Sequence, residues 1–62
     1  MKVFVGIQLG IRQLFVLHDS GAVSMTRLAQ DALDYLERHL PALTKSDLEA
    51  LQSYSITPSS VR

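Results

Sequence analysis

Aliphatic residues alternate with Phe4, Gly6, Gln8 and Gly10 near the start of the chain. Every second position holds an aliphatic side chain, at Val3, Val5, Ile7, Leu9 and Ile11. A period of two is that of a β-strand, and Val and Ile are good strand formers. A second apolar run, 14–18, also has the length of a strand. We therefore predict two strands, with a turn between them at 10–13.

A second turn is predicted after this run. Asp19, Ser20 and Gly21 are turn residues, and glycine adopts a positive φ without steric cost. Ala22 and Val23 then have room for a brief third strand. Segment 1–23 is thus predicted to form a β-hairpin or a three-stranded meander.

The hydrophobic period changes after residue 23. Apolar residues now recur at helical spacing, at Leu28, Ala29, Ala32, Leu33, Leu36 and Leu40. Ser24 is a suitable N-cap, and the residue before Pro41 is disfavoured in helical conformation. The pattern predicts a helix over 24–40.

A second helix is predicted over 44–55. Two residues are candidates for its N-cap, because Thr44 precedes Asp47 by three residues and Ser46 precedes Glu49 by three. Leu48, Leu51 and Tyr54 are expected to point inward, and 56–62 is expected to be a tail. The chain is predicted to be one α+β domain, 1–62, in which two antiparallel helices follow the hairpin or meander.

Length and charge limit the number of domains, the means of stabilisation and the classes of binding partner. The chain has 62 residues, no cysteine, and six basic against six acidic residues. One domain fits this length, no disulfide can stabilise it, and zero net charge disfavours binding that depends on phosphate contacts. Both faces of the predicted hairpin are apolar, and two short helices are not expected to cover them. We therefore predict a homodimer that completes the fold.

The sequence predicts no enzyme. His18, Asp19 and Ser20 are the residue types of a catalytic triad, but neighbours on a strand point to opposite sides. His18 and His39 lack a metal-ligand spacing. We expect no catalytic, metal or cofactor site. No apolar segment has the length of a membrane span or the form of a signal peptide, so a cytoplasmic location is the default expectation.

The remaining function class is protein binding. We expect a small interaction module that regulates or inhibits a protein partner. Tyrosine is favoured at interface centres, and the other candidates are apolar residues of the sheet face and near the tail, and charged residues of the first helix face. The candidate partner-binding residues are Phe4, Phe15, Arg27, Tyr35, Arg38, Tyr54 and Ile56.

An alternative function comes from the last third of the chain. Segment 46–61 resembles a helix-turn-helix, with a turn at Ser55 and Ile56 and a second helix capped by Thr57 with Pro58 at its first position. The resemblance implies a DNA-binding transcriptional regulator. Only one basic residue, Arg62, follows the predicted turn.

Overall fold

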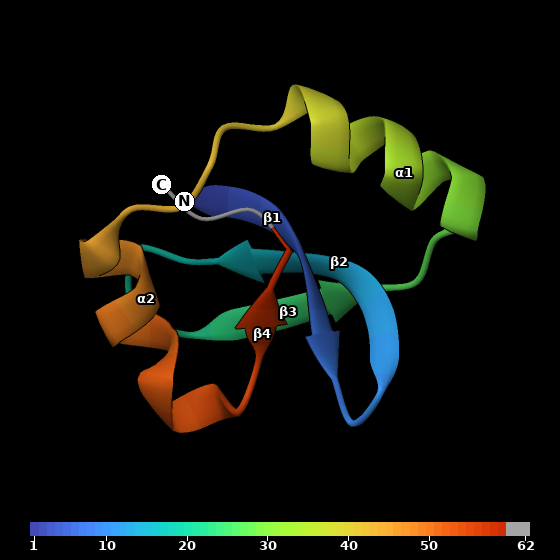
Figure 1. Ribbon diagram of the computed structural model, residues 1–62. Helices are drawn as coiled ribbons and strands as arrows, with labels where there is room; N and C mark the ends of the chain where they lie inside the picture. The colour runs from blue at the N-terminus through green and yellow to red at the C-terminus, as the bar shows by residue number, and fades with distance from the viewer. Residues whose placement is uncertain (60–62) are drawn as a thin grey trace.

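An antiparallel sheet and two separate helices make up the computed structural model, which describes residues 1–59 (Figure 1). The strands are β1 (Lys2–Gln8), β2 (Ile11–Leu17), β3 (Val23–Thr26) and β4 (Thr57–Pro58). The helices are α1 (Gln30–His39) and α2 (Lys45–Leu51), and a 3-10 turn, η1 (Gln52–Tyr54), follows α2. The strand order is β3-β2-β1-β4, so β1 and β2 lie at the centre. The α+β prediction is confirmed at this level.

The first hairpin is confirmed, but its turn lies earlier than predicted. Gln8 pairs with Ile11, which leaves Leu9 and Gly10 as a two-residue loop. Both have a positive φ, 55° and 77°, as a type I′ turn requires. The apolar alternation of 3–11 runs through this turn without a break. Periodicity therefore placed the turn at 10–13, where β2 has already begun.

The third strand is longer than predicted and the first helix is shorter. Ser24 was predicted as the N-cap, but it lies in β3 opposite Val16. The N-cap is Ala29, which provides no side-chain hydrogen bond. Residues 24–26 satisfy their backbone groups by pairing with the open edge of β2, and this pairing outweighs a weak local helix signal.

The second helix begins at one of the two candidate N-caps. Thr44 and Asp47 form a reciprocal capping box, so Thr44 and not Ser46 is the N-cap. The α-helix ends at Leu51, and η1 continues it to Tyr54. Leu51 is buried, while Leu48 and Tyr54 pack against the core as predicted.

The predicted tail contains a strand. Thr57 and Pro58 pair with Ile7 and Gly6 of β1, and the preceding Ile56 is buried. The helix-turn-helix prediction of a helix that begins at Thr57 and Pro58 is therefore wrong, because these two residues form a strand. The remainder of that predicted helix, 60–62, lies outside the described residues.

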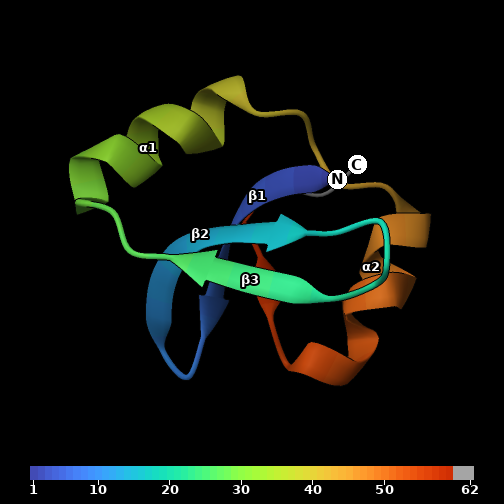
Figure 2. The same ribbon diagram turned by 180° about the vertical axis from the view of Figure 1, so that it is seen from behind.

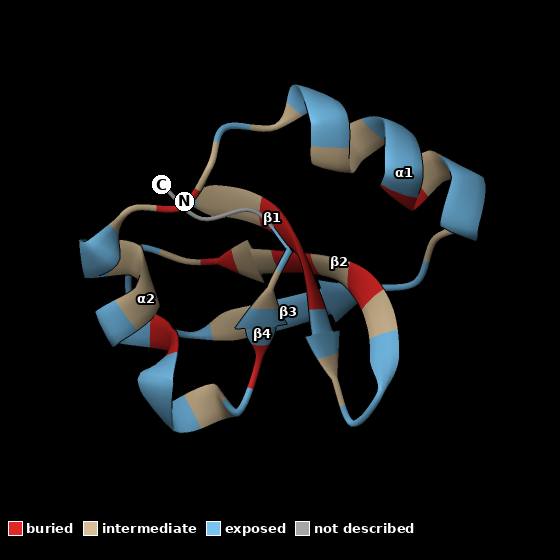
Figure 3. Cartoon of the chain, in the orientation of Figure 1, coloured by how far each residue is buried: buried red, intermediate tan, exposed pale blue. Residues whose placement is uncertain are grey.

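One face of the sheet carries the main core. Its buried members are Phe4, Phe15, Leu17, Leu43, Leu51 and Ile56. The rings of Phe4 and Phe15, which are opposite each other on β1 and β2, stack with centroids 5.5 Å apart. In Figure 3 much of the buried colour falls on β1 and β2. Segment 45–56 covers this face.

The opposite face is covered by α1. Val5 points away from Phe4 because neighbouring strand residues alternate, and it is buried, as is Leu33 of α1. Helix α1 contacts β1 and β2 and makes no contact with α2. The two helices lie apart in both views (Figures 1 and 2). The predicted helical hairpin is therefore wrong, because each helix covers a different face.

This arrangement changes the reason for expecting a dimer. The sequence predicted that two short helices would leave one sheet face uncovered. Since α1 and α2 lie over opposite faces, that premise does not hold for the described residues. Dimerisation itself stays a prediction.

Candidate interaction surface

Large aliphatic side chains remain exposed around the β1–β2 turn. We call residues 7–11 the hairpin tip. Ile7 is 40% exposed, Leu9 94% and Ile11 54%. Ile11 is opposite Gln8, so the side chains of Ile7 and Ile11 lie on opposite faces of the hairpin. With Leu9 at the apex, the three side chains give the tip an apolar, convex surface.

Leu9 is also in an unfavourable backbone conformation. Its φ of 55° lies in the left-handed region, where a residue with a Cβ atom costs about 1–2 kcal/mol. Asn, Asp and Gly are the residues that this turn favours. A leucine that is 94% exposed obtains little compensating packing from the rest of the described chain. Leucine at position 9 is therefore unfavourable for the stability of the fold.

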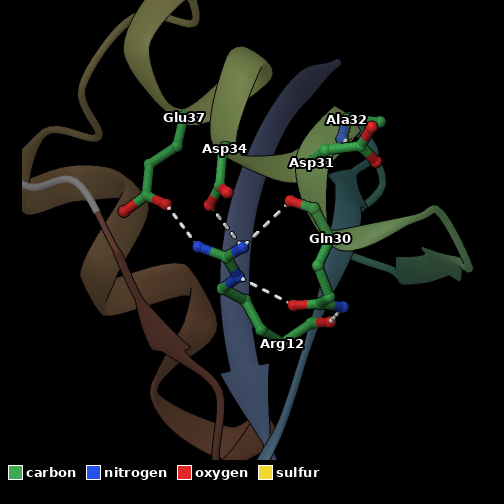
Figure 4. A network of polar contacts seen from close by, with 6 residues as sticks. All are labelled: Arg12, Gln30, Asp31, Ala32, Asp34 and Glu37. Atoms are coloured by element: carbon green, nitrogen blue, oxygen red, sulfur yellow. Dashed lines mark hydrogen bonds and ion pairs between the residues drawn. The ribbon is translucent and has the colours of Figure 1, made fainter.

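An arginine network fixes α1 to the sheet directly behind the hairpin tip (Figure 4). The Arg12 Nε donates to Gln30 Oε1 at 3.2 Å, and its Nη2 donates to the Gln30 carbonyl oxygen at 3.1 Å. Nη2 also donates to Asp34 Oδ1 at 2.5 Å, and Nη1 donates to Glu37 Oε2 at 3.0 Å. The hydrogen bond to Asp34 and the charge of Glu37 raise the pKa of Arg12.

Two glutamines in and beside the hairpin tip form hydrogen bonds with the backbone of other parts of the fold. Gln8 Nε2 donates to the Tyr54 carbonyl oxygen at 2.9 Å, which ties β1 to η1. Gln13 is buried, and its Oε1 accepts from the Leu28 backbone N–H at 3.1 Å. The hairpin tip thus has a rigid base and no charged side chain between positions 7 and 11.

The two edges of the sheet differ. Strand β4 has two residues, and one is Pro58, which has no N–H to offer a further strand. At the other edge, β3 presents Ser24, Met25 and Thr26, all exposed. β3 contains neither proline nor a charged residue, which are the usual protections of an edge strand.

An open pocket of about 350 Å³, with both apolar and charged residues in its lining, lies near the other end of the sheet. It is lined by Met1, Lys2, Leu17, His18, Asp19, Gly21, Asp47 and Ala50. Lys2 Nζ pairs with Asp47 Oδ2 at 2.7 Å, and the N-terminal amine pairs with Asp19. The hydrogen bond from Lys2, supported by the Thr44 backbone N–H, lowers the pKa of Asp47 to about 2. Both carboxylates are therefore held ionised by a cation.

His18 and Ser20 do not assemble with Asp19 into a catalytic arrangement. The Nε2 of His18 lies 2.8 Å from the Ser24 hydroxyl, and the Ser20 hydroxyl accepts from the Ala22 backbone N–H. In residues 1–59, no group of three or more His, Cys, Asp or Glu side chains is placed to hold a metal ion. Neither helix of this part of the chain is long and apolar enough to cross a membrane.

The seven residues predicted from the sequence do not form one site. Phe4, Phe15 and Ile56 belong to the core, so their side chains are not presented to a partner. Tyr54 is half-buried, and its hydroxyl donates to the Gly21 carbonyl oxygen at 2.6 Å. Apolar strand residues were candidates because the sheet was expected to be uncovered.

The other three candidates are surface residues. Tyr35 is 58% exposed, and its ring lies 4.2 Å from that of His39. Arg27, in the loop between β3 and α1, and Arg38, on α1, are exposed as well. The exposed apolar residues of the hairpin tip were missed, because the alternation that predicts the first strand continues through Leu9 and Gly10 to Ile11.

Comparison with known proteins supplies no relative. The chain matches no protein-family model, no curated protein and no solved structure.

Proposed function

We propose that this protein is a small non-enzymatic module that binds a partner protein, regulates or inhibits it, and acts as a homodimer. The observation that carries this proposal is the exposure of Ile7, Leu9 and Ile11 at one place on the surface. Clustered exposed apolar side chains are typical of interaction sites, whereas single ones are ordinary.

The size of the chain strengthens this argument. A domain of about 60 residues buries only ~60% of the surface of its unfolded chain. Full burial of a leucine or isoleucine stabilises a protein by about 1.5–3 kcal/mol. With Ile7 40%, Ile11 54% and Leu9 94% exposed, the small fold forgoes part of this stabilisation, and burial against a partner recovers it in the complex.

The homodimer is proposed to form through β3. Two copies of an unprotected edge strand can pair antiparallel about a twofold axis, which joins their sheets. The Pro58 edge is unsuited to the same pairing. Met25, 51% exposed on β3, then packs against the partner copy near the axis.

The oligomeric state is tested by light scattering during size exclusion. We expect a mass of about twice 6.9 kDa for the wild type and of one chain for Met25→Lys, which places a charge on the edge strand. Glu49→Lys adds a lysine on the exposed side of α2 and is expected to remain dimeric. A monomeric wild type at micromolar concentration would refute the homodimer.

Partner binding is tested by photo-crosslinking in the native cell. A crosslinking amino acid is placed at exposed positions 9, 25, 35 and 49 in turn. The proposed function predicts a covalent adduct with one protein other than a second copy of this chain, formed from at least one of these positions and competed away by the unlabelled chain. Without such an adduct from any position, the proposed function is rejected.

A further inference from the structure

We propose that the hairpin tip is a docking wedge that inserts Leu9 into an apolar pocket of the partner protein. This inference rests on the proposed function and assigns it to one surface. It names a residue, Leu9, that stability alone does not account for.

The first support is the conflict between residue type and conformation at position 9. A two-residue type I′ turn is most stable with Asn-Gly, and this chain has Leu9 and Gly10. Leu9 therefore carries backbone strain while its side chain is 94% exposed. Strain that the fold does not need is a recognised sign of a functional position.

The second support is the shape of the hairpin tip. Ile7 and Ile11 lie on opposite faces of the hairpin, and Leu9 extends beyond both. A convex apolar end is complementary to a concave site, where an anchor side chain is desolvated from all sides. A flat partner surface would contact Leu9 and leave at least one isoleucine in water.

The third support is rigidity. Strands β1 and β2 are paired over their whole length, from Lys2 opposite Leu17 to Gln8 opposite Ile11. Arg12 fixes the base of the hairpin to α1, and Gln8 fixes it to the carbonyl of Tyr54. Binding through a pre-formed hairpin loses little conformational entropy, which favours affinity from a small contact area.

The fourth support concerns the chemistry of the occupant. Positions 7–11 carry no charge, and the nearest described ion pairs join one cation, Arg12, to two carboxylates, Asp34 and Glu37. This surface is not attractive to phosphates of nucleic acid or of an anionic membrane. The 350 Å³ pocket of a second copy contains the ion pairs Lys2–Asp47 and Met1–Asp19 in its lining, and an inserted leucine would remove these charges from water without compensation. An apolar pocket in a different protein is the matching site.

The test combines a stability measurement with a binding measurement. Leu9→Asn restores the favoured turn and removes the apolar side chain, while Leu9→Met keeps an apolar side chain of similar size. We expect Leu9→Asn to raise the urea midpoint of unfolding. The protein crosslinked from position 9 is identified, purified and titrated with each variant by calorimetry. We expect binding at least about tenfold weaker for Leu9→Asn and within about threefold of the wild type for Leu9→Met.

Other outcomes would refute the proposal that Leu9 inserts into a pocket of the partner protein, and each has a distinct readout. Adducts from position 25 or 35 without one from position 9 would refute it and leave the proposed function standing. Unchanged affinity for Leu9→Asn would also refute it, as would a lower urea midpoint for that variant. Binding to phosphatidylcholine vesicles that Leu9→Asn abolishes would assign the tip to a membrane instead.

Discussion

Lys2 of β1 and Asp47 of α2 form an ion pair with 2.7 Å between Nζ and Oδ2, although 45 positions separate them. The same carboxylate oxygen accepts hydrogen bonds from the backbone N–H and the hydroxyl of Thr44. One atom therefore completes the N-cap of α2 and attaches that helix to the central strand. Beside the core packing of Leu48 and Leu51, part of the attachment of α2 therefore depends on the charge of a single side chain.

This link predicts a loss of stability in acid. The pKa of Asp47 is lowered from 3.8 to about 2 in the folded chain, first by the Lys2 hydrogen bond. Stabilisation from a lowered carboxyl pKa is present above the unfolded value and is lost as the pH falls through the folded value. Between pH 4 and pH 2 we expect the free energy of unfolding to fall by about 1–2 kcal/mol more in the wild type than in Asp47→Asn. Urea unfolding at each pH measures the difference.

A matched control uses Glu49 on the same helix. Glu49 is exposed, and its side chain has no hydrogen bond or ion pair with residues 1–59. Glu49→Gln is expected to follow the wild-type pH dependence. If Asp47→Asn shows the wild-type slope as well, the Lys2 pair does not contribute measurably.

The second core predicts a contrast between two neighbours on α1. Leu33 is fully buried against the sheet, while Tyr35, two residues later, is 58% exposed. Leu33→Ala is expected to cost about 2–5 kcal/mol, as large-to-small core substitutions do, and Tyr35→Ala less than about 1 kcal/mol. Urea unfolding followed by circular dichroism compares the two. Similar costs would mean that α1 is not packed as described.

Replacement of Gly6 by any residue with a Cβ atom is predicted to lower the stability of the fold, because neighbouring side chains pack closely around it. A Cβ atom there would lie 3.0 Å from Ile56 Cγ2, 3.2 Å from the Phe4 ring and 3.3 Å from the Phe15 ring. We expect Gly6→Ala to destabilise the fold by about 1–3 kcal/mol through overpacking. Thermal unfolding measures this loss.

Gly10 provides the comparison. It has a φ of 77° and open space around it, so conformation and not packing limits substitution. Asparagine adopts such a φ readily, and Gly10→Asn is expected to be nearly neutral, whereas Gly6→Asn is expected to be worse than Gly6→Ala. The opposite order would contradict the close packing at Gly6.

The Arg12 network predicts a salt-dependent attachment of α1. Arg12→Lys keeps the charge but loses the planar group that contacts Gln30, Asp34 and Glu37 together. We expect a lower urea midpoint for Arg12→Lys, and a difference from the wild type that shrinks in about 1 M salt, where screening acts within about 3 Å. Arg38→Lys, on the exposed side of α1, is the control. An effect of Arg38→Lys equal to that of Arg12→Lys would contradict the network.

Elements with a strong local signal could be predicted from the sequence. The strands around Val5 and Phe15, the start of the second helix at Thr44 or Ser46 and the helix end before Pro41 each depend on residues close together in the chain. The β1–β2 turn could not be located by periodicity, because Leu9, Gly10 and Ile11 continue the alternation of β1.

Elements that depend on distant partners could not be predicted. Ser24 became a strand residue because β2 offered it an edge, and Thr57 because β1 did. The coverage of both sheet faces depends on where α1 and α2 dock, which no local pattern encodes. The candidate site was missed for the same reason, since exposure of Leu9 is known only after the core is known.

The pairing of Gly6 with Pro58 has a kinetic consequence. The β1–β2 and β2–β3 hairpins are local and can form within microseconds, whereas β1 and β4 meet only after a loop of 49 intervening residues between Ile7 and Thr57 has closed (57 − 7 − 1). Until then Ile56 does not cover Phe4 and Phe15, and a partly folded chain exposes its aromatic face. Pairing of the last strand is therefore the long-range step that completes the cover over the aromatic face of the sheet.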